Sequence, residues 1–142
     1  CLDNNVNYID WYELDPEIVD SCYRHLPTVC SKVKKSNTVN TFWGDAFESI
    51  KSVEDSKYDK IFVDLNDDQY CIDLARKNMK SLKRILKPGG VITAQVGSKD
   101  KKPRQVENWC NVLQKSFGNV KVSGVHIPSF DCNWNFASSI MK

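Results

Sequence analysis

One stretch of this chain, YDKIFVDLNDD at residues 58–68, most narrows the folds that it can adopt. Residues 61–63 form a short apolar run rich in β-favouring side chains, and acids follow at once, which predicts a buried strand over residues 60–65. In a parallel α/β sheet, ligands bind just beyond the carboxyl ends of the strands. Asp64 therefore leaves the strand where a ligand could sit. A solvated turn that caps the next helix is the other interpretation of the same acids.

Strands and helices alternate along the rest of the chain. Further strands are predicted over residues 7–14, 39–43, 91–96, 120–125 and 136–141. Helices are predicted over residues 16–26, 46–53, 69–86 and 104–117. This α/β order implies a mostly parallel sheet with helices on both faces. The last two strands have no helix between them, which predicts an antiparallel C-terminal hairpin at one edge.

Two helix ends carry clear signals. Asp15 is placed to cap the first helix, Pro16 fits its first position, and we expect Pro27 to end it. The sequence Lys-Pro-Gly-Gly at residues 87–90 is expected to end the third helix. The face of that third helix toward the core is predicted from its spacing to consist of Cys71, Leu74, Ala75, Asn78, Met79, Leu82, Ile85 and Leu86.

Composition narrows the class of protein. The 142 residues suffice for one domain with a real core, so residues 1–142 are expected to form a single domain. A net charge of +2 gives no strong attraction to nucleic acid, and the short basic runs at residues 32–35 and 99–104 are interpreted as solvated loops. No apolar run approaches the length of a membrane span, and no signal-peptide pattern opens the chain.

Six cysteines and two histidines bear on metal binding and redox state. The cysteines form no Cys-x-x-Cys pair, and His25 and His126 are far apart in sequence, so we expect no zinc site or other metal site. An even count permits disulfides, but reduced thiols in a cytoplasmic enzyme domain are the simpler interpretation. Because the chain begins with Cys1 and not Met, we expect that it is a piece of something longer.

Acids follow three of the predicted strands: Glu13, Asp45 and Asp64. In a nucleotide-binding α/β fold, an acid near the end of such a strand accepts hydrogen bonds from the ribose hydroxyls. An acid after the next strand can accept from an adenine amino group. Each acid alone could simply be a helix cap. Together they indicate an edge of the sheet that binds a nucleoside.

These residues resemble the spermidine synthase family of aminopropyltransferases, which have the Rossmann-like class I S-adenosylmethionine-dependent methyltransferase fold. The matching pieces are YELDPEIVDSC at 12–22, GDAFESI at 44–50, YDKIFVDLNDD at 58–68, LKPGGVITAQVGS at 86–98 and IPSFDCNWNFASSIMK at 127–142. The LKPGG piece is generic to methyltransferases, whereas the other motifs are more specific. The resemblance extends across nearly the whole chain.

The resemblance implies aminopropyl transfer from decarboxylated S-adenosylmethionine to a polyamine such as putrescine. On the nucleoside side, Glu13 would hold the ribose hydroxyls, and Asp45 with the Ala46 backbone would hold adenine. The implied ligands are therefore a nucleoside sulfonium, or the related S-adenosylmethionine or methylthioadenosine, and a small polyamine. No metal, membrane or nucleic acid is implied.

On the amine side, the resemblance implies that Asp64 orients and deprotonates the attacking amine. Asp67 would help to bind the amine, and Gln95 of the Ala-Gln-x-Gly-Ser motif would lie at the substrate. An ammonium is not a nucleophile, so a carboxylate that attracts it and takes its proton fits the chemistry. The sulfonium is already a good leaving group, so positioning supplies much of the remaining rate.

The chain also departs from the family. The family's N-terminal β domain, its first strand and its glycine-rich loop are absent, and Phe130 stands where the family usually has Tyr. In the family order, the absent strand lies between residues 7–14 and 60–65. We therefore expect these 142 residues not to complete a sheet alone; an upstream segment, a partner chain or a swapped copy in a homodimer would fill the position. A non-catalytic scaffold or subunit of a larger assembly is the alternative function.

Overall fold

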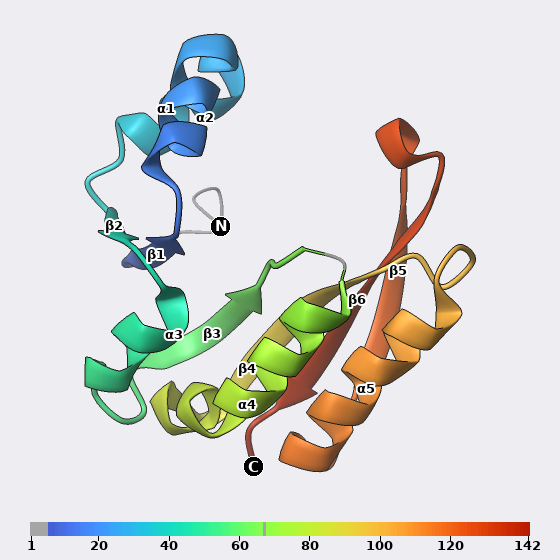
Figure 1. Ribbon diagram of the computed structural model, residues 1–142. Helices are drawn as coiled ribbons and strands as arrows, with labels where there is room; N and C mark the ends of the chain where they lie inside the picture. The colour runs from blue at the N-terminus through green and yellow to red at the C-terminus, as the bar shows by residue number, and fades with distance from the viewer. Residues whose placement is uncertain (1–5, 67) are drawn as a thin grey trace. The chain divides into compact units, whose positions relative to one another are not determined.

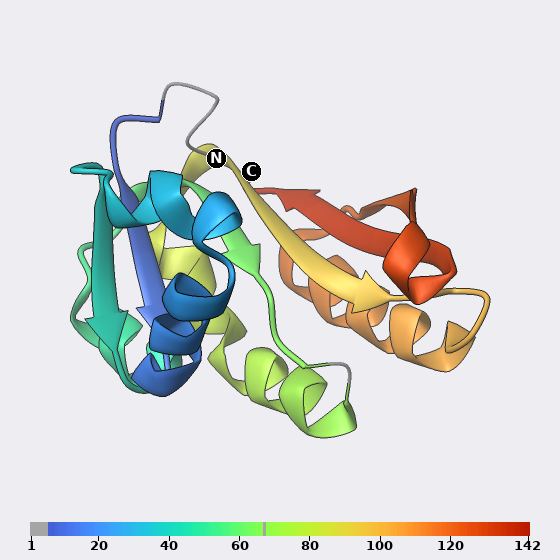
Figure 2. The ribbon, with the colours of Figure 1, turned by 90° about the horizontal axis from the view of Figure 1, so that it is seen from above.

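The computed structural model describes residues 6–66 and 68–142 (Figures 1 and 2). The chain divides into two compact units, Cys1–Ser52 and Val53–Lys142, here called unit 1 and unit 2. No helix in the described parts of the chain is both long enough and apolar enough to cross a membrane.

Unit 1 is built on a two-stranded parallel sheet. Its elements are β1 (Ile9–Glu13), α1 (Pro16–His25), α2 (Pro27–Lys34), β2 (Val39–Trp43), α3 (Ala46–Ser49) and the 3₁₀ turn η2 (Ile50–Ser52). The strands pair in register from Ile9 opposite Val39 to Glu13 opposite Trp43. The Asp15 side chain caps α1, as predicted, by accepting from Glu17 N at 2.9 Å. Both predicted strands of this unit are confirmed.

Helix α2 was not predicted from the sequence. Pro27 ends α1, as expected, but it is also the first residue of α2. Proline suits the first helical position because its missing N–H would have no partner there. The predicted helix over residues 46–53 is likewise shorter, because α3 gives way to a 3₁₀ turn at Ile50.

Unit 2 contains a four-stranded mixed sheet. Its elements are β3 (Tyr58–Val63), α4 (Gln69–Ile85), β4 (Leu86–Gly97), α5 (Pro103–Phe117), β5 (Lys121–Ile127), the 3₁₀ turn η3 (Pro128–Phe130) and β6 (Cys132–Ile140). The order across the sheet is β3-β4-β6-β5. Strand β4 is parallel to β3, and β6 is antiparallel to both β4 and β5. The predicted antiparallel hairpin is therefore confirmed.

Helices α4 and α5 lie on the same side of this sheet, and the core of unit 2 lies between them and the strands (Figures 1 and 2). The fully buried side chains include Ile72 and Ala75 of α4, Leu113 of α5, and Ile92 of β4. The predicted core face of α4 is partly wrong: Ile72 is buried, whereas Cys71 and Leu74 are half-buried. The buried residues of α4 recur three or four positions apart from Ile72, which sets the face one position away from Cys71.

The boundary between α4 and β4 also differs from the predicted one. Helix α4 stops at Ile85, and the residues expected to form only a turn begin β4, with Leu86 opposite Tyr58 and a register shift before Val91. Gly90 suits this crowded place because an added Cβ would lie 2.7 Å from Leu86 Cδ1 and 3.0 Å from the Asp59 carbonyl oxygen. Strand β3 ends at Val63, so Asp64 follows the strand directly.

The described strands form one sheet in each unit. Strand β1 pairs with β2 in unit 1, and β3 pairs with β4 in unit 2. The expectation that a strand absent from these 142 residues lies between β1 and β3 stays a prediction.

Candidate functional site

The carboxyl ends of β1 and β2 bring together the three residues predicted to bind the nucleoside. Gly44 N donates to the carbonyl oxygen of Glu13 at 2.9 Å, which ties the two strand ends to each other. The half-buried Glu13 side chain accepts from Asp15 N through Oε1 at 3.1 Å. Glu13 and Asp45 therefore lie at the same edge of the unit 1 sheet.

Asp45 also caps α3. Its Oδ1 accepts from Phe47 N at 2.7 Å and from Glu48 N at 3.3 Å, while the carboxylate stays exposed. Ala46, the first residue of α3, is half-buried. The helix-cap interpretation of Asp45 is thus correct for one oxygen. Within the described residues Oδ2 accepts no hydrogen bond, which leaves it open to a ligand donor.

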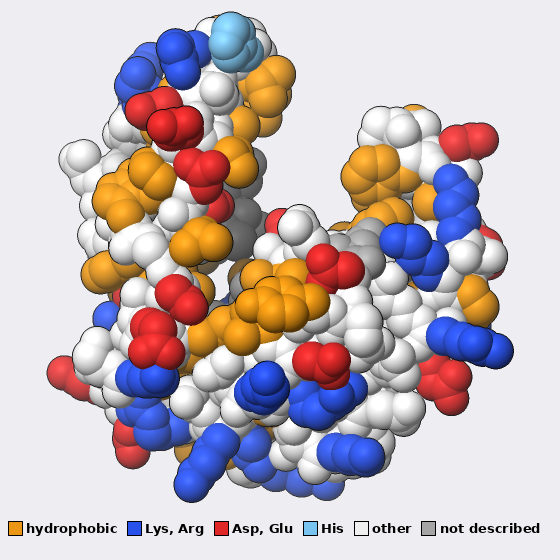
Figure 3. Space-filling view, in the orientation of Figure 1, with side chains coloured by type: hydrophobic (Ala, Val, Ile, Leu, Met, Phe, Trp, Pro, Cys, Tyr) orange, Lys and Arg blue, Asp and Glu red, His pale blue; other side chains and the backbone are white. Residues whose placement is uncertain are grey.

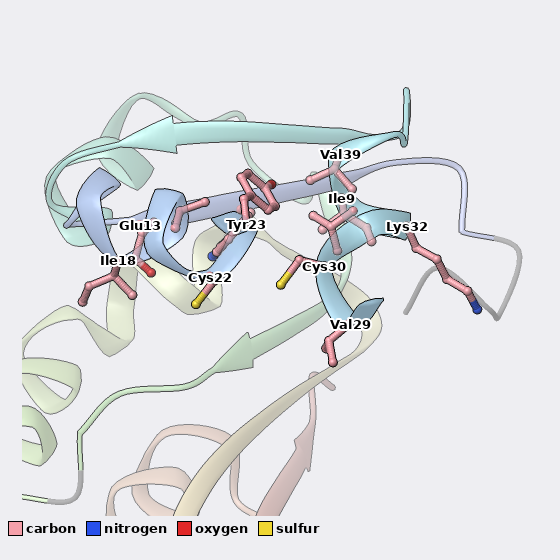
Figure 4. Close-up of a pocket in the computed structure, with 12 residues that line it drawn as sticks. Ile9, Glu13, Ile18, Cys22, Tyr23, Val29, Cys30, Lys32 and Val39 are labelled. Carbon is pink, nitrogen blue, oxygen red and sulfur yellow. The ribbon is translucent and has the colours of Figure 1, made fainter. Parts of the chain in front are cut away.

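A cavity of about 450 Å³ adjoins Glu13 inside unit 1 (Figure 4). Its described lining comes from β1, α1, α2 and β2 and is mostly apolar, with Glu13 and Lys32 as the charged side chains. Cys22 and Cys30, from the two helices, also line it (Figure 4). The predicted ribose-binding acid therefore lies beside a concave apolar surface.

Asp64 is the first residue after β3 in unit 2. Its side chain is exposed, and it accepts no hydrogen bond from the rest of the described chain. A carboxylate so placed can attract a cation and accept a proton from it. Asp67, the predicted amine-binding residue, lies outside the described residues.

Asp68 fulfils the helix-cap interpretation of this acidic cluster. It caps α4 by accepting from Cys71 N at 2.7 Å, and this hydrogen bond is the main cause of the lowered pKa of the Asp68 carboxyl. Burial, followed by the neighbouring Asp68, raises the pKa of the Cys71 thiol. The acids after β3 thus have different roles in the fold. Asp68 stabilises the start of α4, whereas the exposed Asp64 carboxylate can contact a ligand.

Gln95 lies near the end of β4, and the structure brings its amide to the loop that contains Asp64. Its Nε2 donates to the carbonyl oxygen of Leu65 at 2.8 Å. Its Oε1 accepts from the indole Nε1 of Trp134 in β6. The sequence analysis did not select Trp134 as a site residue, although the residue belongs to the C-terminal motif on which the resemblance rests.

The predicted site residues thus fall into two groups. Glu13, Asp45 and Ala46 lie at one edge of unit 1, and Asp64 and Gln95 lie at the carboxyl ends of β3 and β4 in unit 2. The five cysteines in the described residues are free thiols. No group of three or more potential metal ligands occurs within the described residues.

Comparison with known families identifies the chain. The family model for the spermine/spermidine synthase domain matches residues 3–142. The chain belongs to the spermine/spermidine synthase family. The fold inferred from the resemblance and the family named in it are therefore confirmed.

Curated members of this family are similar along most of the chain. A polyamine aminopropyltransferase of Prochlorococcus marinus (strain NATL1A) is 28% identical over 97% of this chain and 50% of its own length. A spermine synthase of Arabidopsis thaliana is 26% identical over 89% of this chain and 36% of its own length. The chain thus spans about half the length, or less, of these relatives.

Solved structures show the same fold. Spermidine synthase from Thermotoga maritima superposes with a TM-score of 0.83 at 14% identity, covering 98% of this chain and 47% of that one. A spermidine synthase in complex with the transition state analogue AdoDATO gives a TM-score of 0.85 at 14% identity, covering 98% and 48%. The α/β fold is therefore that of the spermidine synthases, with about half of the solved chains matched.

Proposed function

We propose that this chain supplies the nucleoside-binding acids and the general base of an aminopropyltransferase. The donor is decarboxylated S-adenosylmethionine, and the acceptor is a small polyamine such as putrescine. Membership of the spermine/spermidine synthase family supports this reaction class. The observation that carries the assignment is Asp64, an exposed carboxylate directly after β3 that accepts no hydrogen bond from the described residues.

Glu13, Asp45 and Ala46 hold the nucleoside part of the donor in this proposal. Glu13 accepts hydrogen bonds from the two ribose hydroxyls, because a carboxylate accepts more strongly than a neutral oxygen. Asp45 accepts from the adenine amino group through the oxygen that does not cap α3, and the Ala46 backbone completes the contact. The bond of 2.9 Å between Gly44 N and Glu13 O supports a common site for these residues.

Asp64 and Asp67 act on the amine. Both carboxylates attract the ammonium group, and Asp64 takes one proton from it, which frees the nitrogen lone pair. The nitrogen then attacks the aminopropyl carbon attached to sulfur. A C–N bond forms as the C–S bond breaks, and sulfur leaves as the neutral thioether of methylthioadenosine. Within the chain this reaction requires no redox step and no metal.

The proposal also concerns the strand that the family has between β1 and β3. The described strands form a two-stranded and a four-stranded sheet, and the family order has a further strand between β1 and β3. We propose that an upstream segment, a partner chain or a second copy provides that strand. Each buried backbone group left without a partner costs about 1–3 kcal/mol.

The free thiols in the described residues fit the cytoplasmic location expected from the sequence.

Replacing Asp64 tests the role of the proposed base. Asp64→Asn should lower the rate of methylthioadenosine formation by about 10²–10⁴-fold, because a positioned general base contributes about that factor. Asp68→Asn is the matched control, because Asn also caps a helix and the residue lies in the same loop. Near-normal turnover in Asp64→Asn together with loss of activity in Asp67→Asn would show that the roles are wrongly assigned.

Ligand binding separates the enzyme from a non-catalytic scaffold. The chain should be melted with and without methylthioadenosine. A ligand at about 100 times its dissociation constant stabilises a protein by roughly 2.7 kcal/mol, which raises the melting temperature measurably. An unchanged melting temperature at millimolar ligand would favour the scaffold.

A further inference from the structure

The amide of Gln95 connects the end of β4 to the loop after β3. The register of the two strands sets Val63 opposite Ala94, so Gln95 lies next to the residues that follow β3. From there Nε2 reaches the Leu65 carbonyl oxygen at 2.8 Å. Leu65 follows Asp64 directly. This hydrogen bond therefore holds the backbone one residue beyond the proposed base.

Trp134 determines which way the Gln95 amide faces. The indole N–H can only donate a hydrogen bond, so the amide oxygen must face Trp134. The amide NH₂ group is then directed at Leu65, whose carbonyl can only accept. Donor and acceptor thus match at both ends, and a flipped amide would lose both hydrogen bonds.

Trp134 is itself held by the turn between β5 and β6. Its ring packs against Phe130 of η3, with ring centroids 4.7 Å apart and an angle of 50° between the planes. Lys101 Nζ, in the loop before α5, donates to the Phe130 carbonyl oxygen at 2.8 Å. The contacts therefore run from the turn before β6 through Trp134 and Gln95 to Leu65, entirely within unit 2.

We propose that Gln95 and Trp134 are positioning residues that hold in place the backbone from which the Asp64 carboxylate extends. Asp64 is held between two anchors: the end of β3 on one side and the bonded Leu65 carbonyl on the other. The backbone has two soft dihedral angles per residue, so this short span has little freedom. A shift of about 1 Å at a reacting group can cost about 10²-fold in rate. The catalytic part of this proposal rests on the proposed function of Asp64.

This role differs from the one implied by the family resemblance, in which Gln95 contacts substrate. A residue that binds the amine directly should affect KM for the amine. A residue that acts through the Asp64 loop should lower kcat and leave KM nearly unchanged. The two roles therefore make opposite predictions for the same variants.

Two variants and one control separate these roles. Trp134→Phe keeps a ring against Phe130 and removes the N–H donor. Gln95→Glu keeps an acceptor for Trp134 and removes the donor to Leu65. Thr93→Val is the control, because it removes the 2.9 Å contact between Thr93 Oγ1 and Ser138 Oγ in the same strand pair without touching the loop.

The first readout is independent of activity. In the isotope-labelled full chain, the ¹⁵N order parameters of the Asp64 and Leu65 amides report how rigid the backbone is at the proposed base. We expect values of rigid backbone in the wild type and in Thr93→Val, and lower values in both Trp134→Phe and Gln95→Glu. Low values in the wild type, or unchanged values in the two variants, would overturn the proposal.

The second readout is steady-state transfer to putrescine. Both variants should lower kcat about 10- to 100-fold, with KM for the amine within about threefold of the wild-type value. A raised KM at unchanged kcat would overturn the proposal and assign Gln95 to the amine. If the wild type forms no product while the order parameters respond as expected, the proposed function fails and the positioning of the Asp64 backbone stands.

Discussion

The two units differ in how much of their apolar surface they bury. In unit 2, α4 and α5 cover one side of a four-stranded sheet, and Ile72, Ile92 and Leu113 are completely buried. In unit 1, a two-stranded sheet carries three helices, and its buried hydrophobic residues in the described range are Val19, Phe47 and Ile50.

In the described part of unit 1 the exposed large hydrophobic side chains outnumber the buried hydrophobic residues, whereas in that of unit 2 the buried ones outnumber the exposed ones. Leu14 and Val29 are each 72% exposed, and apolar side chains are visible over α1 and α2 in Figure 3. Two strands alone provide little stability, because stability grows with the apolar area removed from water. Unit 2 therefore buries a larger apolar core of its own than unit 1 does.

The largest expected effect is in the core of unit 2. Leu113→Ala should lower the free energy of unfolding by about 2–5 kcal/mol, because it leaves a cavity where no part of the side chain reached solvent. Leu14→Ala in unit 1 is the matched control and should change stability by less than about 0.5 kcal/mol. Urea unfolding followed by circular dichroism measures both. Equal losses would mean that the two units do not differ as described.

A bound nucleoside should stabilise unit 1 more than unit 2. Methylthioadenosine is expected to slow hydrogen exchange in β1 and β2 more than in β4 and β6. Glu13→Gln should weaken its binding by about 1–3 kcal/mol, the contribution of a charge-assisted hydrogen bond. Glu48→Gln is the control, because Glu48 is exposed and pairs with Lys51 at 2.6 Å. Equal affinity of wild type and Glu13→Gln would remove Glu13 from the site.

Alanine substitutions at two glycines compare the packing around the inner strand β4 with that around the edge strand β5. Gly90→Ala forces a Cβ to within 3.0 Å of the Asp59 carbonyl oxygen and should cost about 1–3 kcal/mol. At Gly124 in β5 the nearest atom is Asn135 Nδ2, at 2.9 Å from an added Cβ. The Asn135 side chain accepts from Lys99 N at 2.8 Å, so it shifts only by straining that hydrogen bond, but the nearest backbone atom is 3.7 Å away. Thermal melting should therefore show a smaller loss for Gly124→Ala; the reverse order would contradict tight packing at β4.

The smallest effect concerns the Asp68 cap and depends on pH. The Cys71 N–H lowers the folded-state pKa of Asp68 below the ordinary value of 3.8. The stabilisation is therefore fully present above pH 3.8 and is lost as the pH falls through the lower folded value. Asp68→Ala should lower the melting temperature slightly at pH 7, and the difference from wild type should shrink in acid. A difference that stays constant with pH would exclude the carboxylate as its source.

Local signals explain which parts of the fold could be predicted. Strand β2 was predicted with its observed bounds because Gly44 and Asp45 end it abruptly. The helix predicted over residues 104–117 is α5, which begins one residue earlier, at Pro103, and is followed by Gly118 in the left-handed C-cap conformation. Helix α2 was missed because Pro27 gives the same signal for ending one helix and beginning another.

The candidate site was predictable only in part, and for a physical reason. Acids after strands are visible in sequence, so Glu13, Asp45 and Asp64 could be selected. The partners of Gln95 are 30 and 39 positions away along the chain, and no local pattern encodes a hydrogen bond over that separation. The sequence alone does not distinguish Asp68, which caps a helix, from Asp64, whose carboxylate accepts no hydrogen bond from the described residues. The roles of the site residues toward substrate remain predictions.

The position of β6 has a consequence for synthesis. It is translated after every other strand of unit 2, yet it lies between β4 and β5 and provides the pairing for both. Ribosomes add about 5–20 residues per second, so β4 and β5 are synthesised before the strand that pairs with both. Until β6 follows, the backbone groups of β4 and β5 that face it have no strand partner. The sheet of unit 2 is therefore complete only after synthesis has passed residue 140, and a chain that stops before β6 leaves one edge of β4 unpaired and β5 with no strand partner.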